Sequence, residues 1–324
     1  MKVIIPAAGV GTRLKPHTLT LPKPLLHIGG KTILDYLLEP VTELDPEEVR
    51  FVIGYKGDMI KEHVEKNYSF NSTFVVQDEL LGLGYALHIA LRDVANTPLM
   101  VLLGDTIIES DLKKFIRAGK YALGLRQVPD PQRFGIAELD DGYVSHLIEK
   151  PKEPKSNLAL IGLYYFEESD SLKLELQKLV ESGKTTRGEI QLTDALARMI
   201  ANGTKFTPFE VEGWFDCGKK ETMLSTNRHF LKKVPVPERI QDSVIIPPVY
   251  VGDDVSIEKS VIGPNVSLAR GAVIKHSIIS DSIIGRDARV EDMVIQESIV
   301  GREVVLKGRK KILNIGDSTE ISGC

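Results

Sequence analysis

The chain is poor in cysteine: only Cys217 and Cys324 occur in 324 residues, and they stand far apart. This excludes a disulfide-stapled fold and argues against a cysteine-based zinc site. No apolar run reaches the roughly 18 residues that a membrane-spanning helix needs. The apolar stretch before Gly9 is also too short for the core of a signal peptide. We therefore expect a cytoplasmic protein with no membrane partner.

The chain also lacks a dense tract of lysine and arginine, and its formal net charge is −4. Proteins that bind nucleic acid through its phosphates present a strongly basic surface. Neither nucleic acid nor an anionic membrane surface is therefore an expected partner. If the protein binds an anion, individual cations must hold it.

Residues 1–231 have the pattern of an α/β domain. Up to about residue 120, short apolar runs alternate with amphipathic helical segments, which predicts βαβ units. Strands and hairpins are expected over 121–166, with Asp141-Gly142 as a hairpin turn. The prediction is an α/β fold with a Rossmann-like mixed sheet, followed by a proline-containing linker at 232–241. Ligands of such sheets bind beyond the carboxyl ends of the strands.

Residues 242–324 have a different pattern of apolar residues. Written in rows of sixteen from residue 261, the sequence shows three columns, six positions apart, that are aliphatic in every row. This spacing fits neither a helix face nor one long strand, but it fits a coil with three short sides that each point one aliphatic residue inward. The segment resembles the left-handed parallel β-helix built from hexapeptide repeats. The inward columns are expected to be Ile262/Ile278/Val294, Leu268/Ile284/Val300 and Ile274/Val290/Leu306.

The loop after the first strand has the composition of a phosphate cradle. Residues 7–13 read Ala-Ala-Gly-Val-Gly-Thr-Arg, and Lys23 follows in the same connection. Glycines let backbone N–H groups approach phosphate oxygens, Arg13 can form a bidentate contact, and Lys23 adds a mobile charge. The loop is neither a Walker A motif nor a dinucleotide fingerprint, because it lacks Gly-Lys-Ser/Thr and a third glycine. We expect a polyphosphate to bind here.

Two aspartates are candidate metal ligands. Asp105 follows the buried apolar run 98–103, and Asp216 stands in the segment Trp214-Phe215-Asp216. Taken alone, either aspartate could equally be a turn or helix-capping residue. Magnesium, however, often takes one or two protein carboxylates and completes its shell with phosphates and water. Next to a phosphate cradle, the two carboxylates predict a magnesium site.

Two further motifs are weak signals in isolation. Gln77, followed by Gly82 in a glycine-containing loop, could pair with a pyrimidine edge, but a strand end with a flexible loop is the plainer interpretation. Glu149-Lys150 would suit a sugar hydroxyl and a phosphate, yet a solvated surface pair is more common.

Taken in order, these motifs resemble the sugar-1-phosphate nucleotidyltransferase family over residues 1 to about 230. The branch most similar is the long-form glucose-1-phosphate thymidylyltransferases, which carry a C-terminal β-helix. The matching segments are Pro6-Ala-Ala-Gly-Val-Gly-Thr-Arg-Leu-Lys-Pro16, Pro22-Lys-Pro24, Leu81-Gly-Leu-Gly-Tyr-Ala86, Gly104-Asp105, Phe134-Gly135, Glu149-Lys-Pro151, Ile161-Gly-Leu-Tyr164 and Trp214-Phe-Asp-Cys-Gly218.

The resemblance implies a role for each motif. It implies a Mg²⁺-dependent transfer of a nucleotidyl group from dTTP or UTP to a sugar-1-phosphate. The residues implied are Ala8, Gly9, Gly11, Thr12, Arg13, Gln77 and Gly82 for the nucleotide, Asp105 and Asp216 for the metal, and Gly135, Glu149, Lys150 and Gly162 for the sugar phosphate, with Arg13, Lys23 and Lys150 neutralising charge.

Several alternatives stay open. The loop reads Gly82-Leu83-Gly84, where many thymidylyltransferases have Gly-Leu-Ala, so the sequence does not choose between thymine and uracil. GTP, ATP or CTP could replace the pyrimidine substrate, or the protein could be a non-catalytic regulatory subunit. An acetyltransferase activity using His276 in the repeats is disfavoured, because the array is short. The flat sides of the β-helix favour a homo-oligomer.

Overall fold

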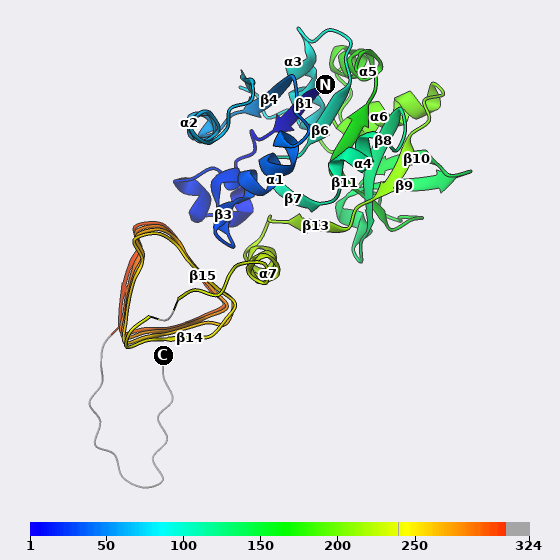
Figure 1. Cartoon of the computed structure of the whole chain (residues 1–324). Coiled ribbons are helices and arrows are strands. Elements are labelled where there is room, and N and C mark those ends of the chain that lie inside the picture. Colours follow the sequence, from blue (N-terminus) through cyan, green and yellow to red (C-terminus); the bar gives the residue numbers. More distant parts are fainter. Residues whose placement is uncertain (239, 309–324) are drawn as a thin grey trace. The chain divides into compact units, whose positions relative to one another are not determined.

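The computed structural model of the chain describes residues 1–238 and 240–308. The chain divides into two compact units (Figure 1). One contains Met1–Leu26 and Lys31–Met223, and the other contains His27–Gly30 and the residues from Leu224 onward. The segments expected from the sequence, 1–231, 232–241 and 242–324, stay a prediction.

The first unit is an α/β domain whose main sheet is mixed, as predicted. Its principal strand order is β10-β9-β11-β6-β1-β4-β5, with β8 pairing to β11 and β12 to β8. Strands β6, β1, β4 and β5 run parallel, whereas β11 is antiparallel to β6. The strands are β1 (Lys2–Pro6), β4 (Glu48–Ile53), β5 (Ser72–Val76), β6 (Leu99–Leu102), β8 (Tyr121–Gln127), β9 (Gly135–Asp140), β10 (Tyr143–Glu149), β11 (Leu158–Phe166) and β12 (Thr207–Glu210).

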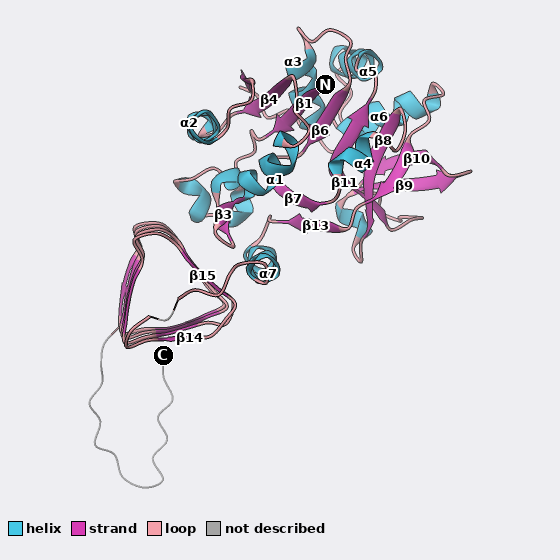
Figure 2. Ribbon diagram, viewed as in Figure 1, coloured by secondary structure: helices cyan, strands magenta, loops and turns pink. Residues whose placement is uncertain are grey.

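Helices cover the sheet because alternate residues of its strands point to opposite faces. In β1, Val3 and Ile5 belong to one buried cluster with residues of α1 and α2, while Ile4 belongs to a second cluster with residues of α3, α5 and α6. Figure 2 shows these helices around the strands. The helices of the first unit are α1 (Ile33–Thr42), α2 (Gly57–Asn67), α3 (Leu83–Leu91), α4 (Leu112–Ile116), α5 (Asp170–Ser182) and α6 (Leu192–Ala201). Helix α7 (Lys220–Leu231) begins in the first unit and continues into the second.

Helix α1 shows how the sequence sets a local boundary. Thr32 and Asp35 form a capping box: the Thr32 hydroxyl accepts from the Asp35 N–H, and the Asp35 carboxylate accepts from the Thr32 N–H, each at 3.0 Å. Such reciprocal bonds satisfy two of the N–H groups that the first helical turn leaves unpaired.

Two two-stranded sheets lie outside the main sheet. One pairs β2 (His27–Ile28) with β3 (Lys31–Thr32), and the other pairs β7 (Thr106–Glu109) with β13 (Gly213–Asp216).

The second unit contains a three-sided coil of parallel strands, which confirms the predicted β-helix (Figure 1). Within residues 240–308, each side is a four-stranded sheet. The first side has β14 (Val244–Ile245), β17 (Val261–Ile262), β20 (Ile278–Ser280) and β23 (Val294–Gln296); the second has β15 (Val249–Val251), β18 (Val266–Leu268), β21 (Ile283–Ile284) and β24 (Ile299–Val300); the third has β16 (Ser256–Glu258), β19 (Val273–Lys275), β22 (Arg289–Glu291) and β25 (Val305–Lys307).

One of the three expected inward columns is wrong. Ile262 is buried, but Ile278 and Val294 are 51% and 76% exposed, and Ile279 and Ile295 fill the core in their place. The pairing Ile262↔Ile279 causes the shift. Six steps lead from Ile262 to Leu268, whereas five lead from Ile279 to Ile284, so the corner shortens by one residue and reverses the in–out alternation. The columns that contain Leu268 and Ile274 pair as predicted.

Among residues 1–238 and 240–308, the structure shows no helix that combines the length and the apolarity needed to cross a bilayer.

Replacing Ile279 by alanine should lower the free energy of unfolding by about 2–5 kcal/mol, because a fully buried side chain is lost and a cavity remains. The matched change Val305→Ala should cost less than about 0.5 kcal/mol, since Val305 is exposed on the outside of the same coil. Urea denaturation of both variants measures the difference. Equal, mild effects would mean that Ile279 does not face the core.

Candidate functional site

A pocket of about 540 Å³ lies where β1 and β6 end in the first unit. This position agrees with the rule that ligands of open α/β sheets bind at the carboxyl ends of strands. The structure brings many of the predicted residues together around it. Those lining the pocket are Ala8, Gly9, Gly11, Thr12, Arg13, Lys23, Gln77, Gly82 and Asp105, together with Leu80, Leu83, Leu103, Glu189 and Gly218 among others.

The two glycines of the first loop, which follows β1, have different structural roles. Gly11 has φ of 67°, in the left-handed region, and its carbonyl accepts from the Thr18 hydroxyl at 3.0 Å. Gly9 has no such constraint, since a Cβ placed on it would meet no protein atom within 4 Å. The protein's own packing therefore requires glycine at position 11 but not at position 9. Open space beside Gly9 on a pocket wall suits a ligand that approaches the backbone closely.

A buried ammonium group faces a carboxylate inside the pocket. Lys23 Nζ lies 2.8 Å from Asp105 Oδ2, and the side chains are 6% and 49% exposed, respectively. Lys23 begins the short helix η3 (Lys23–Leu25), and Asp105 follows β6. Burying a lysine charge without a partner is costly, so the pair keeps the charge in place.

Backbone contacts fix where Asp105 stands. The Gly104 N–H donates to the Pro6 carbonyl at 3.0 Å, and a Cβ on Gly104 would lie only 3.0 Å from that oxygen. Glycine at this position therefore lets the ends of β6 and β1 meet. Asp105 and the first loop are thereby brought to the same pocket.

Asp216 reaches the same region from a distant part of the chain. Strand β13 pairs antiparallel with β7, so that Asp216 stands opposite Thr106, the residue after Asp105. A Cβ on Gly218 would lie 2.8 Å from both Asp216 Oδ1 and Arg13 Nη2, which places these groups on either side of one small residue. Arg133 Nη2 lies 3.8 Å from Asp216 Oδ2.

The donor set is compatible with a magnesium ion that the substrate helps to bind. In the part of the chain that the structure describes, no group of three or more metal-ligating side chains occurs. Asp105 and Asp216 could supply two carboxylate oxygens, and the neighbouring pocket could supply phosphate oxygens and water. Magnesium sites in phosphate-binding proteins typically have this composition.

Gln77 and Gly82 also line the pocket. Gln77 is buried; its N–H donates to the Ile53 carbonyl at 2.8 Å, and its Nε2 donates to the Glu79 carbonyl at 3.0 Å. Gly82 has φ of 103°, and a Cβ there would lie 2.8 Å from Glu189 Cβ and from the Ile190 carbonyl oxygen. Glycine is thus required by the close approach of residues 189–190, a reason that the sequence pattern did not indicate.

A tight turn spans Thr186 to Glu189, and it is not among the predicted site motifs. Arg187 and Gly188 both have positive φ, 57° and 82°, and the Thr186 N–H donates to the Glu189 carbonyl at 2.8 Å. These angles are those of a two-residue type I′ turn. The turn carries Glu189 to the pocket wall, and a general cue was present in Arg187-Gly188 as a turn dipeptide.

A second cluster surrounds Glu149. The register of β10 and β9 pairs Glu149 with Gly135. The Thr193 hydroxyl donates to Glu149 Oε2 at 2.6 Å, and Lys150 Nζ lies 3.3 Å from Glu149 Oε1. A Cβ on Gly135 would lie 3.0 Å from both Glu149 Oε2 and Thr193 Oγ1. Burial and the nearby Glu149 carboxylate raise the pKa of Tyr164, which keeps its phenol neutral.

Gly162 links this cluster to the pocket. It stands in an irregular part of β11, with φ of 88°, and its carbonyl accepts from the Leu103 N–H at 3.0 Å. A Cβ on Gly162 would lie 2.6 Å from the Leu103 side chain, which itself lines the pocket. Arg187 Nη2 also donates to the Lys150 carbonyl at 2.6 Å. The two groups of predicted residues are therefore neighbours.

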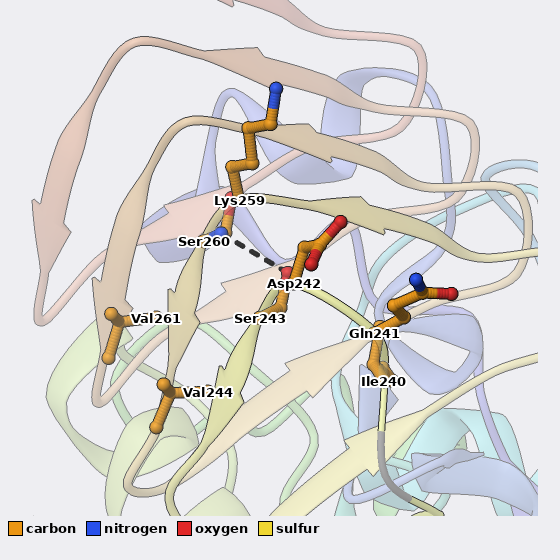
Figure 3. Close-up of a pocket in the computed structure, with 8 residues that line it drawn as sticks. All are labelled: Ile240, Gln241, Asp242, Ser243, Val244, Lys259, Ser260 and Val261. Atoms are coloured by element: carbon orange, nitrogen blue, oxygen red, sulfur yellow. Dashed lines mark hydrogen bonds between the residues drawn. The ribbon is translucent and has the colours of Figure 1, made fainter.

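A larger hollow of about 720 Å³ lies on the β-helix, where Asp242 and Lys259 occupy successive corners (Figure 3). The Ser260 N–H donates to Ser243 Oγ at 3.2 Å across these coils. The hollow contains none of the predicted site residues.

Known proteins resemble the chain along most of its length. A model of the family described as nucleotidyl transferase matches residues 2–233. The Haloferax volcanii low-salt glycan biosynthesis nucleotidyltransferase Agl11 is 35% identical over 252 residues, covering 74% of this chain and 68% of that protein. A glucose-1-phosphate thymidylyltransferase from Streptomyces antibioticus is 32% identical over 314 residues, covering 88% of this chain and 87% of that protein. A crystal structure of UDP-glucose pyrophosphorylase complexed with UDP-glucose shares the fold, with a TM-score of 0.63 at 24% identity over 72% of this chain and 99% of that one.

The contrast between Gly9 and Gly11 provides a test of phosphate binding by the first loop. Gly9→Ala should leave the melting temperature unchanged, because its Cβ meets no protein atom, yet should weaken the binding of inorganic tripolyphosphate several-fold. Gly11→Ala should instead destabilise the fold by about 1 kcal/mol, because alanine is strained at positive φ. Calorimetric titration and thermal unfolding measure the two effects. Undiminished binding by Gly9→Ala would contradict the cradle.

Proposed function

The chain belongs to the nucleotidyl transferase family, and on that premise we propose that it transfers a nucleotidyl group to a sugar-1-phosphate. The donor is a pyrimidine nucleoside triphosphate, dTTP or UTP, and glucose-1-phosphate is the acceptor to test first. The products are a nucleotide sugar and pyrophosphate. The observation that carries the proposal is the pocket with Arg13, Lys23 and Asp105, which adjoins the cluster around Glu149 and Lys150.

On this proposal the nucleotide lies along the first pocket. Its phosphates contact the loop at Ala8, Gly9, Gly11 and Thr12, with Arg13 and Lys23 as the cations. Its base reaches Gln77 and Gly82. The side-chain amide offers one donor and one acceptor, which match the alternating acceptor and donor groups of a uracil or thymine edge.

The sugar phosphate occupies the second cluster. The Glu149 carboxylate, already bonded to Thr193, accepts from a sugar hydroxyl, and Lys150 contacts the phosphate. Gly135 and Gly162 leave room for the sugar ring beside the backbone. Asp105 and Asp216 hold Mg²⁺, which neutralises phosphate charge when bound.

The reaction needs no general base. A phosphate oxygen of the sugar-1-phosphate is already an anion; it forms a bond to the α-phosphorus of the triphosphate while the bond to the pyrophosphate oxygen breaks. The residues align the two substrates and stabilise the developing charge, with Arg13 and Lys23 on the nucleotide and Lys150 on the sugar phosphate. No proton has to move in this step.

The direct test is pyrophosphate release from glucose-1-phosphate and Mg²⁺ with dTTP, UTP, GTP, ATP and CTP in separate reactions. We expect release with dTTP, UTP or both. Asp105→Asn should lower turnover by about two orders of magnitude, whereas Asp58→Asn, an exposed position on α2 outside the pocket, should not. Release with a purine nucleotide alone would contradict the role of Gln77. If no nucleotide releases pyrophosphate with any sugar phosphate, a non-catalytic subunit would be favoured.

We also propose that copies of the chain associate through the first side of the β-helix. This side carries an outward column of aliphatic residues, Val244, Val261, Ile278 and Val294, which the strand register stacks one above the other. Figure 3 shows Val244 and Val261 pointing the same way from neighbouring strands. No charged residue occurs within the four described strands of this side. A matching uncharged, flat surface is available on every other copy of the chain.

The other two sides are unlike the first. On the second side, the Ser267 hydroxyl donates to Asn227 Oδ1 of α7 at 2.6 Å, so the chain's own helix packs there. On the third side, charged residues pair between coils, with Glu258 and Lys275 at 3.1 Å and Glu291 and Lys307 at 3.5 Å. Association through the first side would bury apolar area without burying an unpaired charge.

Placing a charge on the first side should therefore prevent association. Val244→Glu should reduce the mass measured by light scattering to that of a single chain, while Val305→Glu on the charged side should leave it unchanged. The two valines are a matched pair, 56% and 57% exposed. A single-chain mass for the unaltered protein, or equal behaviour of the two variants, would contradict the proposed interface.

A further inference from the structure

Glu189 is an unexpected residue in a pocket for a polyanion. It shares the pocket wall with Arg13, Lys23, Gln77 and Gly82. The other carboxylate there, that of Asp105, is bonded to Lys23. A second carboxylate would repel a triphosphate. The Glu189 carboxylate is therefore expected to face a ligand group that donates hydrogen bonds.

The fold holds Glu189 next to the proposed base-binding loop. Two bonds join the segment after the turn to this loop: the Ile190 N–H donates to the Leu81 carbonyl at 2.7 Å, and the Gly84 N–H donates to the Ile190 carbonyl at 2.8 Å. The tight turn between Thr186 and Glu189 fixes the other end. Glu189 therefore keeps a set position beside Gly82.

The Glu189 side chain is oriented as well. Gln191 Nε2 donates to Glu189 Oε2 at 3.0 Å. Gln191 is buried, so this bond anchors one carboxylate oxygen and leaves the other for a ligand. The residue itself is exposed to the pocket, so a ligand can reach it.

The chemistry of a pyrimidine nucleotide leaves few partners for such an oxygen. The phosphates and the base carbonyls are acceptors and would be repelled. The base N–H pairs with the Gln77 amide oxygen on the proposed function. The remaining donors are the ribose hydroxyls, and in the dinucleotide-binding α/β sheets an acidic side chain accepts from a ribose 2′-hydroxyl in this way.

We infer that Glu189 accepts a hydrogen bond from the 2′-hydroxyl of the bound nucleotide and so makes the pocket prefer UTP over a 2′-deoxynucleotide. The inference rests on the proposed function for the identity of the ligand. It assigns Glu189 as a specificity-determining residue and favours a ribonucleotide where the sequence left dTTP and UTP open.

Equilibrium binding tests this without turnover. Calorimetric titration with UTP and with 2′-deoxy-UTP, in the presence of Mg²⁺ and without a sugar phosphate, isolates the one hydroxyl. The unaltered protein should bind UTP about tenfold more tightly, as expected for a hydrogen bond to a charged group. Glu189→Ala should bring the affinity ratio close to one. Both affinities can rise in this variant because a negative charge is removed, so the ratio is the decisive quantity.

Two controls separate recognition from structure. Glu153→Ala removes another exposed carboxylate outside the pocket, and Gln191→Ala removes the anchor but keeps the carboxylate of Glu189; both should retain a preference for UTP. A ratio near one in the unaltered protein, or a preserved ratio in Glu189→Ala, would overturn the inference. So would failure of both nucleotides to bind.

The pyrophosphate assay keeps the two proposals apart. Turnover with an affinity ratio near one would remove the role of Glu189 and leave the proposed function standing. A preference for UTP without turnover on any sugar phosphate would contradict the proposed function and leave the role of Glu189 standing.

Discussion

Two backbone hydrogen bonds at the end of β6 hold the candidate site together. The Gly104 N–H donates to Pro6 at the end of β1, and the Leu103 N–H donates to Gly162 in β11. These bonds join the first loop, the Asp105 carboxylate and the irregular part of β11 to one point of the sheet. Because they are made by the backbone, they depend on residues small enough for close approach, and glycine at 104 and 162 meets that need.

The same geometry explains why much of the site could be predicted from the sequence. The first loop and Asp105 each come shortly after the end of a strand, and parallel strands bring such residues to one edge. The turn at 186–189 could not be predicted in this way. It reaches the pocket through bonds between Ile190 and the loop at Leu81 and Gly84, which lie more than a hundred residues earlier, and no local pattern specifies that pairing. Asp216 likewise depends on the long-range pairing of β13 with β7.

The β-helix shows a different limit of sequence reasoning. Its three-sided coil follows from the aliphatic period, but the residue that faces inward depends on how many residues each corner contains. One residue fewer between Ile279 and Ile284 than between Ile262 and Leu268 moves Ile278 from the expected core to the surface. The composition of the strands hides this, because Ile278 and Ile279 are identical in type. The result is an aliphatic outer surface that a strict six-residue repeat would place in the core.

The charges of the site also suggest the form in which a nucleotide enters it. Lys23 is paired with Asp105, Lys150 with Glu149, and Arg13 and Asp216 flank the same glycine. A pocket whose cations are largely matched by carboxylates offers little net attraction to a free triphosphate. It becomes favourable when the ligand brings a divalent cation, because the carboxylates can then turn to the metal and the lysine to the phosphates. On the proposed function, this pairing favours the magnesium complex of the nucleotide over the free anion, and it accounts for how a chain of net charge −4 can bind a polyanion.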